Sequence, residues 1–204
     1  REGILIFDVG AGVTEFVVFY DGGCMHSGQI TVGCDHIAND LAIGLDISIG
    51  EAREVLKKYG RIAGDNANDE TIEVGTTIGH DPQHRRRAAV DQIIELRVRE
   101  LFSSIREILL NEGVLGYVSR RIEICGGGAN LQGIGGLVHD IFGIPARIGI
   151  PGNVAGLPEE IANPQWVTPV GLLLVGNEQR KVEQTGSLPL RQQLTRDAAQ
   201  FLDL

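Results

Sequence analysis

The sequence is short of basic residues and of long apolar runs, and each shortage excludes a class of protein. Eighteen Lys and Arg residues stand against 27 Asp and Glu, and the resulting formal charge of −9 repels the phosphate backbone of nucleic acids. The longest apolar stretches are interrupted by Gly, Asp or Pro before they reach the roughly 18 residues that a membrane span requires. We therefore expect no nucleic-acid partner and no membrane-spanning segment.

Cysteine is scarce, and its distribution argues against a disulfide framework or a cysteine-based metal site. The three cysteines, Cys24, Cys34 and Cys125, are odd in number, lack CxxC spacing and lie within or beside apolar segments. None of the five histidines stands at a metal-ligand spacing from them. This pattern is typical of a protein from a reducing cytoplasm.

The sequence also lacks an initiator Met, a signal peptide and a charged leader, because Arg1 and Glu2 directly precede an apolar run. We interpret it as a piece of a longer protein. Glycine, in contrast, is abundant. The 28 glycines in 204 residues predict many tight turns, and a hydrophobic fraction of 43% can fill one large core or two small ones.

The first 32 residues have the pattern of an antiparallel strand meander. Short β-rich runs lie at residues 3–9, 14–20 and 28–32, with glycine-containing connections between them. The connection Asp21-Gly22-Gly23 is a strong hairpin signal, because its residues tolerate the backbone angles of a two-residue turn.

Two helices and a polar stretch are expected after the meander. Apolar residues at helical spacing predict a helix at residues 35–43, and Ser48 with Glu51 forms a capping box that opens a second helix ending at Tyr59. Residues 61–84 are rich in Gly, Asp and Asn around a β-like run at 71–74. This part of the chain is predicted to be a small, loop-rich subdomain.

The rest of the chain alternates between helix and strand. Apolar residues recur at intervals of three and four from about residue 87 to 111, which predicts a long helix. The later elements expected are a strand at 121–125, a helix at 131–142, a strand at 146–150 and a helix at 168–174, with a polar linker or tail beyond 176. A meander followed by alternating helices and strands indicates an α/β sheet that carries a side subdomain.

The first candidate site is the segment Asp8-Val9-Gly10-Ala11-Gly12-Val13-Thr14, where one strand ends in an acid and the next begins after two glycines. Glycine lets backbone amides approach an anion closely, because no Cβ stands in the way. Such a turn can hold the phosphates of a nucleotide, with Asp8 binding Mg²⁺ or its waters and Thr14 adding a hydroxyl donor. An ordinary glycine-rich hairpin is the alternative explanation.

The second candidate site is Cys125-Gly126-Gly127-Gly128-Ala129-Asn130, again a strand end followed by glycines and a helix, with Asn130 as the expected N-cap. Three adjacent glycines are costly in chain entropy, so the close approach of another group is a natural reason for them. Tight packing of a strand against a helix is the alternative. The two turns lie about 115 residues apart, and the pair is much more specific than either turn alone.

The pair resembles the second phosphate loop and the adenosine loop of the actin, Hsp70 and sugar-kinase ATPase superfamily, and Gly12-Val13-Thr14 is similar to the actin version. Residues 133–151, 163–164 and 170–173 resemble the bacterial actin-like cell-division family FtsA, and the resemblance runs from about residue 3 to 176. It implies the C-terminal half of such a protein. The fold it implies is α/β: an actin-like, ribonuclease H-like mixed sheet with flanking helices and a small α+β inserted subdomain.

The resemblance divides the chain into three parts. Residues 1–35 and 100–176 correspond to a larger nucleotide-binding subdomain, and residues 36–99 to a smaller inserted one. Residues 177–204 correspond to a polar linker and a C-terminal helix, in which apolar residues recur at helical spacing. These are Leu190, Leu194, Ala198, Phe201 and Leu202.

The resemblance also implies that ATP and Mg²⁺ bind at the glycine turns, with Asp8 as the metal ligand. The expected nucleotide-binding residues there are Asp8, Gly10, Ala11, Gly12, Val13, Thr14, Gly126, Gly127, Gly128 and Asn130. The family's usual turn has a third glycine in place of Ala11 and an Asp in place of Glu15. The resemblance therefore implies ATP binding more strongly than ATP hydrolysis. We expect at most a weak ATPase and not a metabolic enzyme.

Two charged groups extend the implied site beyond the glycine turns. Glu54, Lys57 and Lys58 lie where the family's adenosine-contacting acid and base are expected, about one residue out of register, and a solvated helix face is the alternative. Arg85, Arg86, Arg87 and Arg97 lie where the resemblance places the docking site for the acidic C-terminal peptide of FtsZ, the tubulin-like division protein. Arginines can bind carboxylates through paired N–H donors, although a run of them can also simply solvate the end of a helix.

The function implied is an ATP-binding, filament-forming adaptor that links FtsZ to the inner face of the cytoplasmic membrane at the division site. The C-terminal apolar residues lie where the family has its membrane-targeting helix, but their basic face is thin, and a helix that docks on the protein itself is the stronger interpretation. Two other functions remain open. One is a PilM-like pilus-assembly adaptor, and the other is half of a sugar-kinase-type phosphotransferase.

Overall fold

The computed structural model describes residues 2–62, 70–74, 83–152, 154 and 156–185. The chain opens with β1 (Gly3–Val9), β2 (Thr14–Tyr20) and β3 (Gly23–Ile30), which form the predicted antiparallel meander. Strand β3 begins earlier than the expected residue 28, because Asp21 and Gly22 both take positive φ angles and turn the chain back within two residues.

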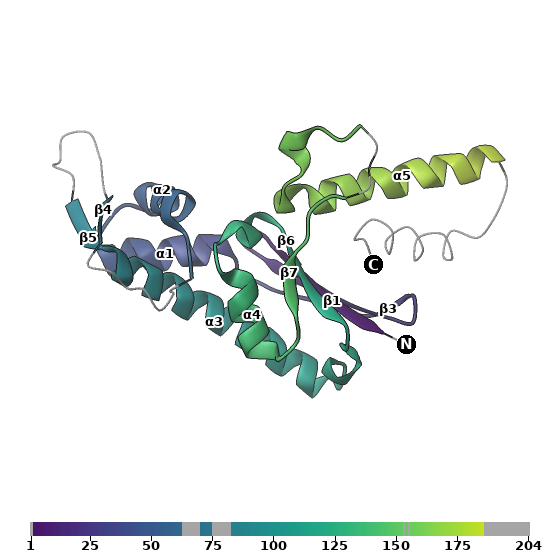
Figure 1. Ribbon diagram of the computed structural model, residues 1–204, viewed down its shortest axis with the longest axis horizontal. Helices are drawn as coiled ribbons and strands as arrows, with labels where there is room; N and C mark the ends of the chain where they lie inside the picture. Colours follow the sequence, from purple (N-terminus) through teal and green to yellow (C-terminus); the bar gives the residue numbers. More distant parts are fainter. Residues whose placement is uncertain (1, 63–69, 75–82, 153, 155, 186–204) are drawn as a thin grey trace.

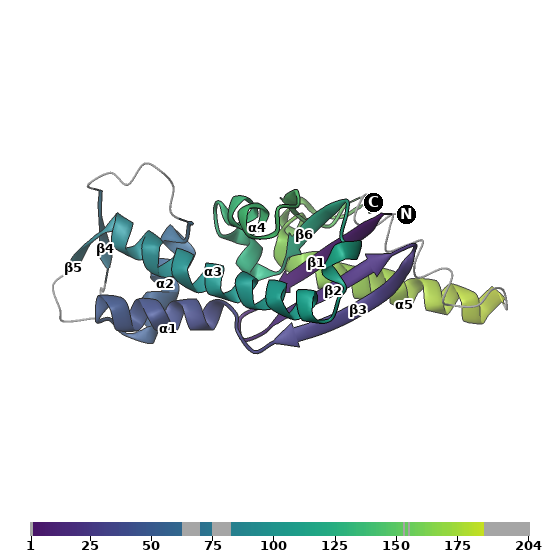
Figure 2. The same cartoon turned by 90° about the horizontal axis from the view of Figure 1, so that it is seen from below.

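A five-stranded mixed sheet forms the centre of the larger part of the molecule. Its order is β3-β2-β1-β6-β7, with β6 (Arg121–Cys125) parallel to β1 and β7 (Ala146–Ile148) parallel to β6. Because side chains alternate along a strand, the sheet presents two different faces. Helices α3 (Arg87–Asn111) and α4 (Ile134–Phe142) lie on one face, and α5 (Val167–Thr185) lies on the other (Figures 1 and 2).

The core lies between the sheet and helices α3 and α4. Leu5, Phe7 and Val9 of β1 are buried on this face, and the ring of Phe7 packs edge-on to Phe102 of α3 at 5.0 Å between centroids. Phe142 at the end of α4 packs on the other side of Phe7, at 5.6 Å. Burial of such aromatic side chains stabilises the fold by about 1.5–3 kcal/mol each.

The smaller part of the molecule stands at one end of the sheet (Figure 1). It contains α1 (Cys34–Leu45), α2 (Ile49–Tyr59), the hairpin of β4 (Thr71–Val74) and β5 (Gln83–Arg86), and the first half of α3. The predicted capping box of α2 is present, because Ser48 Oγ accepts from the Glu51 amide and Glu51 accepts from the Ser48 amide. The predicted boundary between residues 99 and 100 falls within the unbroken helix α3.

Three predicted elements differ from the structure. The arginine run was expected as a surface cluster before α3, but Arg85 and Arg86 belong to strand β5, paired with β4. Helix α4 begins at Ile134 with Gly133 as its N-cap, so the expectation that Asn130 caps a helix from residue 131 is wrong. Helix α5 continues to Thr185, beyond the predicted start of a polar linker, and residues 190–202 lie outside the described part of the chain.

The described residues also contain four short 3₁₀ segments: Leu115–Tyr117, Gly127–Asn130, Glu159–Ile161 and Pro164–Trp166. Among the described helices, none is both long enough and apolar enough to cross a membrane.

Candidate functional site

The two glycine turns meet at the same edge of the sheet. Strands β1 and β6 are parallel neighbours, and Asp8 at the end of β1 is paired with Cys125 at the end of β6. Because both strands point the same way, the chain leaves both of them at one edge, where residues 10–13 and 126–128 follow. The predicted convergence of these two distant segments is therefore observed.

The first turn is held by backbone hydrogen bonds on both sides. The Gly10 amide donates to the Val13 carbonyl at 2.9 Å, which closes the turn between β1 and β2. The carbonyl oxygens of Gly10 and Ala11 accept from the amides of Cys34 and Asp35, at 3.1 and 2.8 Å. These two amides open α1, so the turn satisfies donors that a helix N-terminus leaves without intrahelical partners.

Thr14 has a different role from the one expected. Its side chain is completely buried, and its hydroxyl donates to the Val32 carbonyl at 2.8 Å. This corrects the expectation that Thr14 adds a hydroxyl donor to a nucleotide, because that proton is used to join β2 to the segment before α1. Ala11 and Gly12 are the exposed members of the turn, and nothing lies within 4 Å of a Cβ built on Gly12.

The second turn combines close packing with an exposed centre. Gly126 has a φ of +82°, and a Cβ there would lie 2.3 Å from Asp8 Oδ1. A Cβ on Gly128 would lie 2.3 Å from Val9 Cγ1, so both glycines let the turn pack against the end of β1. Gly127 between them is exposed and has open space around its Cα. Packing explains two of the three glycines but not the middle one.

Asn130 closes the second turn and does not cap α4. Its Nδ2 donates to the Gly127 carbonyl at 3.2 Å and to Asn163 Oδ1 at 3.3 Å. The Gly126 amide donates to the Pro164 carbonyl at 3.0 Å. The Asn163-Pro164 segment therefore supports the glycine turn directly.

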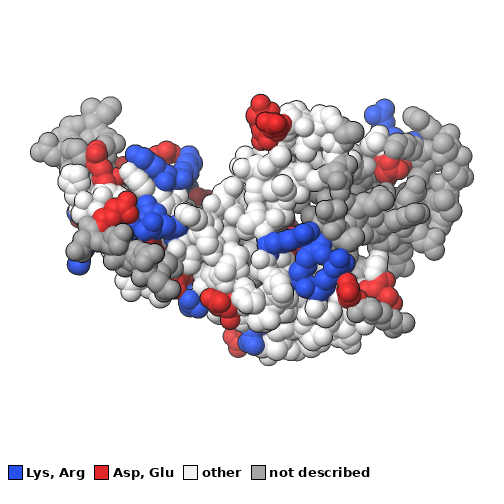
Figure 3. Space-filling model, viewed as in Figure 1, with Lys and Arg blue, Asp and Glu red and all other residues white. Residues whose placement is uncertain are grey.

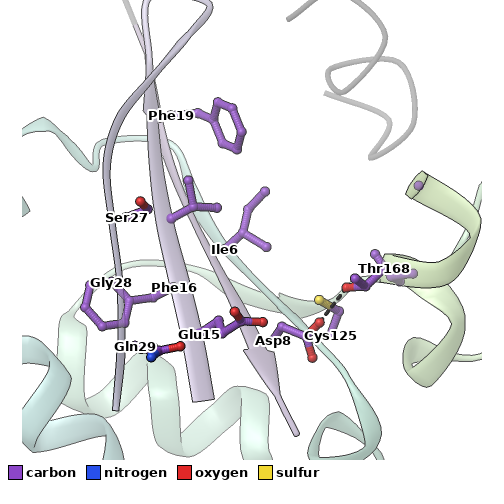
Figure 4. Close-up of a pocket in the computed structure, with 13 residues that line it drawn as sticks. Ile6, Asp8, Glu15, Phe16, Phe19, Ser27, Gly28, Gln29, Cys125 and Thr168 are labelled. Carbon is purple, nitrogen blue, oxygen red and sulfur yellow. Dashed lines mark hydrogen bonds between the residues drawn. The ribbon is translucent and has the colours of Figure 1, made fainter. Parts of the chain in front are cut away.

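A pocket of about 610 Å³ opens beside Asp8, on the face of the sheet that carries α5 (Figure 4). Thr168 in the first turn of α5 donates from Oγ1 to Asp8 Oδ2 at 2.5 Å. Glu15 is paired with Asp8 across β1 and β2 and lines the same pocket. Sequence reasoning missed the role of Thr168, because its contact with Asp8 spans 160 residues and no local pattern reports it.

The two thiols near the turns, Cys34 and Cys125, have raised pKa values. Burial, together with the charges of Asp8 and Glu123, raises the pKa of the Cys125 thiol to about 12. Burial and the charge of Asp35 raise the pKa of Cys34 to about 11. Since the thiolate is the reactive form of cysteine, both side chains act as small apolar groups at neutral pH.

The charged residues of α2 lie outside the pocket beside Asp8. Glu54 and Lys58 line a second pocket of about 310 Å³, formed by α2 and β4. Lys57 pairs with Glu54 at 2.9 Å, and both side chains are about three-quarters exposed. The segment that follows α2 contacts the segment that follows the second glycine turn, because the Ile62 amide donates to the Gln132 carbonyl at 2.8 Å.

The four predicted partner-binding arginines occupy different environments. Arg87 is buried, donates to Asp91 Oδ1 at 2.9 Å and donates to the Tyr59 carbonyl at 2.5 Å, which corrects its expected role as a partner contact. Arg85 donates to the Leu45 carbonyl at 3.1 Å, whereas the Arg86 side chain is exposed. Figure 3 shows basic side chains gathered around α2 and, separately, over β6 and β7.

Arg97 joins two helices of this chain. Its Nε and Nη2 donate to the two carboxylate oxygens of Asp40 on α1, at 2.5 and 2.9 Å, and its Nη1 donates to Glu100 at 2.7 Å. A bidentate pair of this kind fixes geometry as well as charge. Arg97 therefore holds α1 against α3.

Comparison with known proteins identifies the family. The family model for "Cell division protein FtsA" matches residues 5–171. Cell division protein FtsA of Pseudomonas aeruginosa is 31% identical over 178 residues, a match that covers 85% of this chain and 42% of that protein. The chain thus spans less than half the length of this curated relative.

Solved structures with the same fold are less similar in sequence. The structure of MreB5 of Spiroplasma citri bound to ADP has a TM-score of 0.67 at 20% identity, and covers 91% of this chain and 56% of its own. The PilM-PilN type IV pilus biogenesis complex has a TM-score of 0.63 at 18% identity, and covers 86% and 46%. At these identities the likeness shows the fold alone. The chain belongs to the FtsA family of cell-division proteins and has the actin-like fold.

Proposed function

We propose that this chain is the nucleotide-binding half of an actin-like cell-division adaptor. The observation that carries the proposal is the meeting of the two glycine turns at Asp8, with Gly12 and Gly127 exposed and surrounded by open space. Neither glycine is required by packing, and a close approach by a bound nucleotide supplies the missing reason for both. The ligand proposed is ATP.

The residues near Asp8 fit a bound Mg²⁺. Mg²⁺ commonly binds through one or two carboxylates together with phosphate oxygens and waters, without a cage of protein ligands. Asp8 and Glu15 supply two carboxylates that line one pocket, and no cluster of three metal-binding side chains occurs within the described ranges. On this proposal Asp8 holds the ion or its waters, and Thr168 orients the Asp8 carboxylate.

The proposed site requires a second half of the protein. Because the chain spans 42% of its Pseudomonas aeruginosa relative, we propose that the remaining length supplies the opposite wall of the nucleotide cleft. The chain alone is then expected to bind Mg-ATP weakly or not at all. Tight binding of Mg-ATP to the isolated chain, measured by isothermal titration calorimetry, would contradict this dependence.

A substitution in the longer protein tests the site itself. Gly127→Val is expected to weaken Mg-ATP binding about tenfold or more, because a branched side chain would occupy the space of the bound nucleotide. The matched control is Gly116→Val, since Gly116 also has open space around its Cα but lies away from the turns. Equal affinities of these two variants would remove the glycine turns from the nucleotide site.

We further propose that the protein forms filaments and links FtsZ to the inner face of the membrane at the division site, as the family assignment suggests. Arg86 on β5 is the arginine whose exposure best fits contact with the acidic FtsZ tail. We expect Arg86→Glu to weaken binding of an FtsZ C-terminal peptide by about a kilocalorie, on the order of one charged hydrogen bond. Fluorescence anisotropy measures the affinity, and unchanged binding would exclude Arg86.

Arg97 needs a different test because it pairs with Asp40. Arg97→Glu places a third acid beside Asp40 and Glu100 and is expected to weaken peptide binding by loosening α1 from α3. Adding Asp40→Arg reverses the pair and is expected to restore binding. If the double variant stays as weak as Arg97→Glu, then Arg97 contacts the peptide directly, as the family resemblance implies.

A further inference from the structure

The start of α1 lies between the two glycine turns. The Cys34 amide donates to the Gly10 carbonyl of the first turn at 3.1 Å, and Cys34 Sγ lies 3.0 Å from the position of a Cβ on Gly128 in the second. The Asp35 amide donates to the Ala11 carbonyl at 2.8 Å. Helix α1 leads from this point into the smaller part of the molecule (Figures 1 and 2). Side chains in its first turn therefore border the proposed nucleotide site.

Helix α2 presents one of its faces to the same place. A Cβ on Gly60, which ends the helix, would lie 2.7 Å from Leu131 Cδ2, so this face packs against the residue that follows the second turn. Arg53 lies on the same face, because seven residues are close to two full helical turns. Glu54 and Lys58 instead line the pocket that α2 shares with β4. The face that carries Arg53 is therefore the one nearer to the glycine turns.

Arg53 and Asp35 form an ion pair at this border. Arg53 Nε and Nη2 lie 3.2 and 3.1 Å from Asp35 Oδ1. The two side chains are 53% and 46% exposed, so a ligand can reach both of them. A pair this exposed stabilises the fold by less than about 1 kcal/mol. Its effect on stability is therefore small, and Arg53 has further N–H donors for another partner.

The charges of the pair decide which part of a nucleotide it suits. The Asp35 carboxylate repels phosphates, and the guanidinium beside it brings the net charge of the pair to zero. The start of α1 offers no anion site in its place, because the amides of Cys34 and Asp35 donate to carbonyls of the first turn. A neutral pair with acceptor oxygens and N–H donors instead matches hydroxyl groups, which both donate and accept. The ribose of a nucleotide carries two adjacent hydroxyls.

We propose that Asp35 and Arg53 bind the ribose hydroxyls of the nucleotide. The inference rests on the proposed function, since it names the part of the nucleotide that a further pair of residues recognises. Asp35 accepts a hydrogen bond from one hydroxyl, and Arg53 donates to a ribose oxygen while it holds the carboxylate in place. Arg53 thus takes the role in the site that the family resemblance implies for Glu54, Lys57 and Lys58.

Nucleotides with and without the hydroxyls test the pair in the longer protein. Competition titrations compare Mg-ATP with Mg-2′,3′-dideoxy-ATP, which lacks both groups. The unmodified protein is expected to bind Mg-ATP about tenfold more tightly, as the loss of a hydrogen bond to a charged group predicts. Arg53→Ala and Asp35→Ala should each reduce this preference to about threefold or less. The matched control is Lys57→Ala, one turn further along α2 and 73% exposed, which should keep the full preference.

The ratio of the two affinities separates contact with the ribose from a general loss of binding, because a distorted site weakens both nucleotides together. Equal affinities of the unmodified protein for the two nucleotides would overturn the proposal. A full preference in both Arg53→Ala and Asp35→Ala would do the same. Loss of the preference in Lys57→Ala as well would assign the effect to the charge of α2 and not to the pair.

The same titrations distinguish this inference from the proposed function. If the longer protein bound neither nucleotide, both would fail together. If Mg-ATP bound tightly and Gly127→Val weakened it, whereas the Arg53 and Asp35 variants kept the preference for ATP, the nucleotide site would stand. The ribose contact alone would then be wrong.

Discussion

The three consecutive glycines after β6 differ in what a side chain would meet at each. At Gly126 the backbone is left-handed and Asp8 Oδ1 occupies the space of a Cβ, whereas Gly128 lies against Val9. Gly127 has no positive φ angle, and no atom lies within 4 Å of a Cβ built on it. A run of identical residues therefore has two purposes, since its outer members allow packing and its middle member keeps a surface open.

This difference predicts opposite outcomes for two neighbouring substitutions. Gly126→Ala is expected to lower the free energy of unfolding by about 2–4 kcal/mol, because it adds a clash to an unfavourable φ angle. Gly127→Ala is expected to change it by less than about 0.5 kcal/mol, as a substitution on an open surface does. Urea denaturation of both variants measures the difference. Equal losses would mean that backbone entropy, and not the Asp8 contact, sets the requirement for glycine.

Helix α3 carries a buried ion triad where it meets the end of α2. Asp91 is 3% exposed and accepts from Arg61 at 2.7 Å and from Arg87 at 2.9 Å. Arg87 also donates to the Tyr59 carbonyl and lies over the Tyr59 ring. Asp91 and Arg87 are shielded from water, whereas the Arg61 side chain is 31% exposed, and together the three residues tie the end of α2 and the segment after it to α3.

Removing the central acid is expected to be costly. Asp91→Asn should lower the free energy of unfolding by about 3 kcal/mol or more, because it leaves a buried guanidinium without a charged partner. Glu95→Gln on the same helix breaks the more exposed pair with Arg99 and should cost less than about 1 kcal/mol. Thermal or urea unfolding of the two variants provides the comparison. A loss below about 1 kcal/mol for Asp91→Asn would show that the triad contributes little.

Elements with strong local signals could be predicted from the sequence, and those set by distant contacts could not. The meander, α2 with its capping box and α3 follow from periodicity and turn residues. Strand β5 was not predicted, because arginine is a poor indicator of a strand. The strand forms here because its backbone pairs with β4. The start of α4 was misplaced because Asn130 has the chemistry of an N-cap but uses its amide on Gly127 and Asn163.

The candidate site divides in the same way. The glycine turns could be located from the sequence because glycine after a strand is a local signal. The sequence could not show which polar side chains remain available to a ligand. Thr14 and Arg87 do not, because they donate to carbonyl groups 18 and 28 residues away. Thr168 could not be identified as a site residue from the sequence, because only the packing of α5 brings its hydroxyl to Asp8.

Among the described residues, one large hydrophobic core extends through both the larger and the smaller part of the molecule. The cluster of buried residues extends from Val55 and Val74 in the smaller part, along α3, to Phe7 and Phe142 beside the sheet. Helix α3 contributes to both ends of this cluster and crosses the proposed subdomain boundary without interruption. The two parts share their main structural element.

A shared core predicts a single cooperative unfolding transition. The unfolding midpoint from far-UV circular dichroism, which reports on all helices, should coincide with that from the fluorescence of Trp166, which lies immediately before α5. Ile94→Ala, toward the smaller part, and Phe102→Ala, beneath the sheet, should each shift both signals together and by about 2–5 kcal/mol. Separate midpoints for the two signals would indicate that the smaller part unfolds independently.

The parallel pairing of β1 with β6 has a consequence for how this site can vary. The separation of the two turns is set by main-chain hydrogen bonds between the strands, which do not depend on side-chain identity. Replacements within either turn, such as alanine at position 11, can therefore alter the affinity for a ligand without changing the distance between the turns. The backbone conserves the spacing, and the loops are left free to diversify.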